Sequence, residues 1–113
     1  MANNIKWPFG KIDVVALTAT GAQAITIKSQ MTIIDGVTVP ATGNRTINLT
    51  INDNVEAGAI ILFQIKSDAT ETETFGTNIT APVMTGVAGK THVQLFMYNG
   101  TAFVATGADQ QID

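Results

Sequence analysis

Apolar and polar residues alternate along most of this chain, with the period of two that is typical of half-buried β-strands. The clearest run, "RTINLTI" from Arg45 to Ile51, places Ile47, Leu49 and Ile51 on one face and Thr or Asn on the other. Six further runs have strand-forming composition: 24–28, 31–39, 59–66, 70–76, 91–98 and 101–106. No helical periodicity extends over a convincing length. The pattern predicts an all-β domain, an antiparallel β-sandwich or barrel of jelly-roll-like architecture with an extended N-terminal arm.

Two dipeptides predict turns within these runs: Asp35-Gly36, and Asn99-Gly100 in the closing hairpin. If Asn99-Gly100 is a two-residue loop, Phe96 opposes Phe103 and Tyr98 opposes Thr101. The hairpin then has an aromatic face of Phe96, Tyr98 and Phe103, and an aliphatic face of Val93, Leu95, Met97 and Val104.

The run at 59–66 is also apolar on both sides. Its two sets are Ile61, Phe63 and Ile65 on one side, and Ile60 and Leu62 on the other. Fully exposing a side chain the size of Phe or Leu forgoes about 1.5–3 kcal/mol of burial. A second sheet covers one side of such a strand, and we predict that another copy of the chain covers the other. The aromatic face of the closing hairpin is the candidate oligomer interface. The alternative is that the chain's own arm and loops cover both sides.

The chain divides into an N-terminal arm over 1–11, a β domain over 12–107 and a polar C-terminal tail over 108–113. The arm contains Trp7-Pro8-Phe9, in which two aromatic rings flank a rigid proline. Because Trp and Phe are enriched in interface centres, Trp7 and Phe9 are candidates for binding a neighbouring protein. Folding of the arm over its own sheet is the equal alternative.

Composition narrows the functional classes. The 113 residues are 45% hydrophobic and only 13% charged, with a net charge of -3. Scattered basic residues and a pI of 4.8 do not fit nucleic-acid binding. The chain has no cysteine, which excludes thiolate chemistry, and no apolar run long enough for a membrane helix. No secretion leader is visible, so we expect a soluble protein that is made in a cytoplasm and stays there until it assembles or is released.

Residues that could carry chemistry are few. His92 is the single histidine and is interpreted as a polar strand-end residue. Glu71 and Glu73 share one strand face and are interpreted as a solvated face rather than as an acid pair for glycoside hydrolysis. The other carboxylates considered, as Ca²⁺ ligands, are Asp53, Glu56 and Asp68, and their loops lack dense acidic spacing. We therefore expect no enzymatic activity, no cofactor and no metal.

The second half of the chain, about 43–107, resembles small β-rich structural proteins of tailed-bacteriophage particles. The matching elements are Ala57-Gly58 before an apolar strand, "TFG" at Thr74 to Gly76, and the aromatic hairpin "YNGTAFV" from Tyr98 to Val104. Such modules occur in capsid decoration proteins and in head and tail fibres, often as trimers. Fibre versions usually have Trp where this chain has Phe103.

The resemblance implies a virion protein that decorates a phage capsid as a homo-oligomer, most commonly a trimer, and that is assembled in the cytoplasm of the bacterial host. Its partners would be further copies of itself and the major capsid protein or other virion proteins, with neither nucleic acid nor membrane. The candidate interface residues are Trp7, Phe9, Phe96, Tyr98 and Phe103. The alternative function is a fibre module that binds a host surface polysaccharide.

Overall fold

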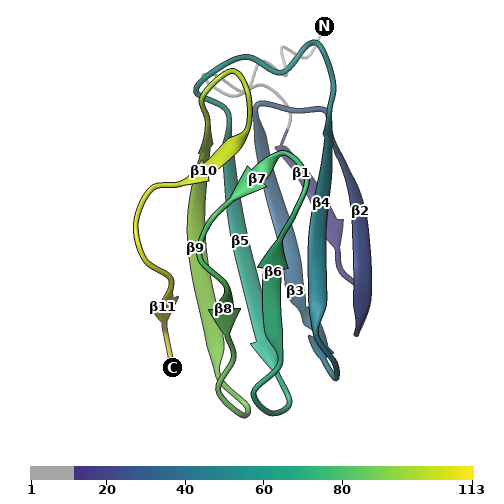
Figure 1. The fold of residues 1–113 in the computed structure, drawn as a ribbon, viewed down its shortest axis with the longest axis vertical. Helices are drawn as coiled ribbons and strands as arrows, with labels where there is room; N and C mark the ends of the chain where they lie inside the picture. Colours follow the sequence, from purple (N-terminus) through teal and green to yellow (C-terminus); the bar gives the residue numbers. More distant parts are fainter. Residues whose placement is uncertain (1–11) are drawn as a thin grey trace, which may run out of the picture.

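The computed structural model describes residues 12–113, which form eleven β-strands in two sheets and no helix (Figure 1). The larger sheet contains, in spatial order, β1 (Ile12–Ala16), β3 (Met31–Ala41), β5 (Ile60–Ser67), β9 (Thr91–Tyr98), β10 (Phe103–Ala105) and β7 (Ile79–Thr80), with β11 (Gln110–Gln111) also paired to β9. The smaller sheet, in front in Figure 1, contains β2 (Gly21–Ile27), β4 (Arg45–Ile51), β6 (Thr72–Phe75) and β8 (Met84–Thr85). The prediction of an all-β fold is confirmed.

Strand direction differs from the prediction. From β1 to β6 the chain alternates between the two sheets, so each sheet receives every second strand and these strands run parallel. Parallel pairs join β1 to β3, β3 to β5, β2 to β4, β4 to β6 and β7 to β10. Antiparallel pairs join β9 to β5, β10 and β11, and β6 to β8. In the described residues the chain therefore winds back and forth between two sheets, and antiparallel strands complete the fold. The expectation of an antiparallel, jelly-roll-like sandwich is wrong in the direction of strand pairing.

The dipeptide Asp35-Gly36 does not form the predicted turn, and β3 continues through it to Ala41. A tight hairpin turn of type I′ needs positive φ at both central residues. Among the described glycines, positive φ occurs only at Gly21, Gly58, Gly89 and Gly100. Gly36 instead permits a close approach, because a Cβ there would lie 3.0 Å from both the Arg45 guanidinium and the Gln64 carbonyl oxygen. The close packing of β3 against β5 and the Arg45 side chain therefore explains why residue 36 is a glycine.

The closing hairpin has the predicted faces in a different register. Tyr98 pairs directly with Phe103, so the loop spans residues 99–102 rather than two residues. The Asn99 side-chain oxygen accepts hydrogen bonds from the N–H groups of Thr101 and Ala102, which stabilises this wider loop. Because the register moves by an even number of residues, every side chain keeps its predicted face.

Inner positions of the two sheets form the core, and the period-two prediction is confirmed there. On β5, Ile61, Phe63 and Ile65 are fully buried, whereas Ile60 and Leu62 on the opposite face are only partly buried. On β4, the face predicted from Ile47 and Leu49 is likewise the buried one. The sequence pattern therefore identifies the inner face of each of these strands.

The aromatic face predicted as an oligomer interface belongs to this core. Phe96 and Phe103 have no exposed surface. The Phe96 ring centroid lies 5.1 Å from that of Phe75, which comes from the other sheet, and Tyr98 stacks on Phe103 at 5.1 Å. These rings fill the space between the sheets. The interface hypothesis for Phe96 and Phe103 is thus corrected, because neither ring has the accessible surface that another copy would need.

The C-terminal segment predicted as a polar tail over 108–113 contains β11. Gln110 pairs with Val93, and Asp109 Oδ2 lies 2.8 Å from His92 Nδ1. This segment therefore extends the larger sheet beside β9. The predicted N-terminal arm over 1–11, with Trp7 and Phe9, lies outside the described residues.

Adjacent isoleucines on β5 provide a matched test of the two faces. We expect Ile61→Ala to lower the free energy of unfolding by about 2–5 kcal/mol, because it leaves a cavity in the core. Ile60→Ala removes the same atoms from the partly exposed face and should cost less than half as much. Urea unfolding followed by circular dichroism measures both, at a protein concentration low enough for the chain to be monomeric. Equal losses, or a larger loss for Ile60→Ala, would contradict the assigned faces.

Candidate functional site

The two glutamates predicted to form a solvated face have different surroundings. Glu71 is partly exposed, and its Oε1 accepts a hydrogen bond from the Ala69 N–H. Glu73 has no exposed surface, and both of its carboxylate oxygens accept from Arg45 Nε, at 2.9 and 3.1 Å. The prediction of a solvated face is therefore wrong for Glu73, which is half of a buried ion pair.

Both terminal nitrogens of the Arg45 guanidinium donate to backbone carbonyls. Nη1 donates to Thr18 O at 3.1 Å and to Val39 O at 3.3 Å, and Nη2 donates to Gly36 O at 3.5 Å. Arg45 begins β4 in the smaller sheet, whereas Gly36 and Val39 lie on β3 in the larger sheet. One guanidinium thus links both sheets and the connection between β1 and β2. Its role is structural, since no exposed surface gives a substrate access to it.

Burial also changes the acidity of the glutamate. The pKa of the Glu73 carboxyl lies above its ordinary value of 4.5, because lost hydration outweighs the charge and hydrogen bond of Arg45. Burying such a pair costs the hydration of both charged groups. Removing one partner alone leaves the other charge buried and uncompensated.

The other candidates for acid-base or metal chemistry do not converge. His92 is buried on β9 beside Asp109, where it holds the C-terminal segment. Within residues 12–113, no group of three or more His, Cys, Asp or Glu side chains is placed to hold a metal ion. That finding covers Asp53, Glu56 and Asp68, the carboxylates considered as calcium ligands.

The most unusual surface is the outer side of the larger sheet. Strand register aligns nine aliphatic side chains there in two rows, which we call the aliphatic face. The first row is Ile12, Met31, Ile60, Met97 and Val104, and the second is Val14, Ile33, Leu62 and Leu95. The most exposed members are Val14 at 61%, Ile12 at 45%, and Leu95 and Met97 at 42% each. A contiguous apolar surface across five strands is typical of an interaction site.

The outer side of the smaller sheet has the opposite character, and we call it the polar face. Its register positions carry only small or hydroxyl side chains and one amide: Ala22, Ala24, Thr26, Thr46, Asn48, Thr50, Thr72, Thr74 and Thr85. Thr and Asn hydrogen-bond to water, and Ala exposes little apolar area. The polar face is therefore suited to contact with water. Aliphatic side chains at outer strand positions are not a feature that the two sheets share.

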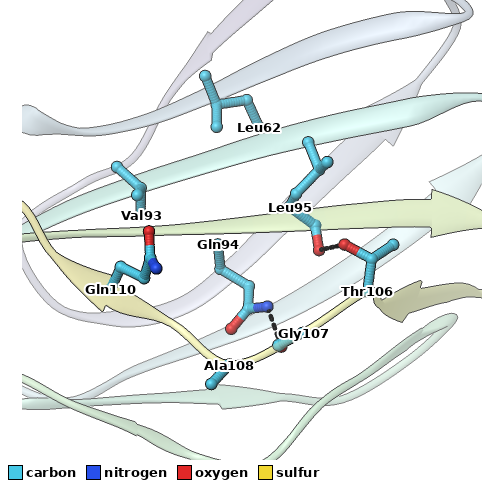
Figure 2. A pocket seen from close by; sticks show the side chains of 8 residues that line it. All are labelled: Leu62, Val93, Gln94, Leu95, Thr106, Gly107, Ala108 and Gln110. Carbon is cyan, nitrogen blue, oxygen red and sulfur yellow. Dashed lines mark hydrogen bonds between the residues drawn. The ribbon is translucent and has the colours of Figure 1, made fainter.

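A shallow hollow of about 250 Å³ lies at one border of the aliphatic face (Figure 2). Leu62 and Leu95 line one side, and the segment from Thr106 to Ala108 lines the other. The Thr106 N–H and hydroxyl both bind Leu95 O, and Gln94 Nε2 donates to Gly107 O at 2.6 Å. The hollow is therefore a fixed feature of this border, large enough to receive a side chain.

Sequence reasoning found part of this site. It recognised that the closing hairpin and the strand at 59–66 are apolar on both sides, but it assigned the oligomer interface to the aromatic face. The aliphatic sets it described were Val93, Leu95, Met97 and Val104 on the hairpin, and Ile60 and Leu62 on the strand. It missed the contribution of β1, because that strand was not recognised. The alternation of Ile12 and Val14 with Asp13 was the available signal. The burial of Arg45 was also missed, although its phase with Ile47 and Leu49 was the available signal that it lies on the core face.

Comparison with known proteins adds no relative: no family model, no curated protein and no solved structure matches the chain. Among residues 12–113, no helix has the length and apolar character needed to cross a membrane.

The two members of the ion pair should respond differently to substitution. Arg45→Met leaves the Glu73 carboxylate and several backbone carbonyls unpaired, and we expect it to lower the free energy of unfolding by about 3–5 kcal/mol. Glu73→Gln keeps a carbonyl oxygen that accepts from Arg45 Nε but leaves the guanidinium charge uncompensated, so it should also be destabilising, by less than Arg45→Met because that hydrogen bond is kept. Urea denaturation at pH 7 measures both. A harmless Arg45→Met substitution would refute the linking role of the guanidinium.

The raised pKa of Glu73 predicts a pH dependence. The folded state binds this proton more tightly than the unfolded state, so the resulting stability is fully present below pH 4.5 and is lost as the pH rises through the folded-state pKa. Asp35, whose pKa is lowered by hydrogen bonds from Thr38 and Val37, contributes the opposite trend. The unfolding free energy of wild type minus that of Glu73→Gln isolates Glu73. This difference should decrease from pH 4 to pH 7, and a difference that increases would contradict the raised pKa.

Proposed function

We propose that this chain is a structural component of a phage particle, an auxiliary protein that decorates the outside of the capsid as a homo-oligomer. The resemblance of 43–107 to such proteins supports the proposal, and it implies three copies as the oligomeric state. The sandwich-like arrangement of two sheets is compatible with a module that works by surface contacts.

The observation that carries the proposal is the difference between the two outer faces. Both faces belong to one domain, and both could carry side chains that are compatible with water. Only the polar face carries such side chains. Leaving side chains of the size of Leu, Ile and Met exposed forgoes about 1.5–3 kcal/mol for each one that could be fully buried. Such a surface also promotes aggregation unless a partner covers it. An assembly component has that partner by definition.

Decoration stabilises a capsid through the number of contacts and their dependence on the assembled state. An oligomer that touches several capsid subunits at once gains avidity beyond any single contact. If the contacts exist only on the assembled shell, binding stabilises that shell by linkage. Trp7 and Phe9 remain candidates for the contact with the shell or with a neighbouring copy.

The alternative of a polysaccharide-binding fibre module has less support from the described residues. Sugar rings stack on accessible aromatic side chains, and the large hydrophobic residues that are exposed between 12 and 113 are all aliphatic. Tyr98 is partly buried against Phe103 and offers no open ring face on that side.

Particle composition tests the proposed function. Phage particles from cells that carry this gene would be purified on a density gradient and analysed by quantitative mass spectrometry. We expect the chain in a fixed ratio to the major capsid protein, retained through the gradient, and accessible to antibody on the capsid surface. Its absence from the purified particles would refute the proposal, and labelling confined to tail or fibre tips would favour the alternative.

A further inference from the structure

We infer that the aliphatic face is the surface through which copies of this chain bind one another. The inference rests on the proposed function for its biological setting, and it replaces the aromatic face as the oligomer interface. The occupant of the face is a second copy of the chain.

The dimensions of the face fit the centre of such an interface. Five strands spaced about 4.8 Å apart and two rows of side chains about 7 Å apart give an apolar area of roughly 300 Å². A specific interface buries about 800 Å² on each partner, and its centre is more apolar than its rim. The aliphatic face is thus smaller than a whole interface of this kind and has the size of its apolar centre.

The next row along the strands has the character of a rim. It consists of Ala16, Asp35, Gln64, Val93 and Gln110, which align by strand register. This row is mainly polar, in contrast to the nine aliphatic residues beside it. The hollow lined by Leu62 and Leu95 lies at the same border and can receive a side chain from the partner.

Charge does not oppose a second copy of the chain at this face. The protein carries a net charge of -3, so two copies repel one another over most approaches. The aliphatic face has no charged side chain, and the charged residues nearest its border on the central strands, Asp35 and Lys66, have opposite signs. Two copies can therefore join through this face without placing like charges together at its centre.

The mass of the full-length protein in solution tests the inference, by light scattering coupled to size exclusion. We expect wild type to be a dimer or trimer at micromolar concentration. Leu95→Asp buries an unpaired charge at the contact and should weaken self-association about 100-fold or more, which gives a folded monomer. Thr50→Asp adds the same charge to the exposed polar face and should leave the mass unchanged. Val14→Asp serves as a second variant if Leu95→Asp fails to fold.

Several outcomes would overturn the inference. They are an unchanged mass for folded Leu95→Asp, dissociation by Thr50→Asp as well, or a monomeric wild type. In a monomer, fluorescence of Trp7, the single tryptophan, identifies the cover. Blue-shifted emission that Leu95→Asp shifts to the red would assign the face to residues 1–11, and solvent-like emission would assign it to another protein. Solution mass does not depend on capsid binding, so this inference and the proposed function fail separately.

Discussion

The buried guanidinium of Arg45 is the constraint on which the arrangement of the two sheets depends. A charge without exposed surface needs partners in every direction in which it has a donor, and these partners come from β6, from β3 and from the connection before β2. Glu73 and Thr18 are far from Arg45 along the chain, and the partners on β3 lie on the other side of the connection from β3 to β4. The hydrogen bonds from the guanidinium to β3 therefore hold the two sheets together where the chain passes from one to the other.

The parallel pairing in this part of the fold is consistent with that constraint. Arg45 and Glu73 are direct neighbours in the parallel ladder of β4 and β6, so the pair forms only in this register. Gly36 completes the arrangement, because a side chain there would occupy the space that the guanidinium needs. A shift of one residue in β4 would move Arg45 to the outer side and an uncharged Thr into the pair. The polar pair thus specifies a register that apolar packing alone would define less sharply.

Periodicity predicted which face of a strand is buried, but not the strand it pairs with or the direction of pairing. The alternation around Ile47 and Phe63 identifies the inner positions of β4 and β5, because one face of each sheet must be buried away from water. Direction depends on contacts between residues far apart in the sequence, such as Arg45 with Glu73, which no local pattern reveals. The wider loop at Asn99 depends on a side-chain hydrogen bond, and the pairing of β11 depends on the free edge of β9.

The same separation between inner and outer positions explains how the candidate site arises. The core needs apolar residues only at alternate positions, so the outer positions of each strand can change without loss of the fold. On β4 and β6 those positions are mostly Thr and Asn, which solvent accepts at little cost. On β1, β3, β5 and β9 the outer positions that form the aliphatic face are Ile, Val, Leu and Met, and within residues 12–113 several of these side chains stay exposed. The fold tolerates either choice, so the core alone does not account for the aliphatic one, whereas the self-association that we infer would account for it.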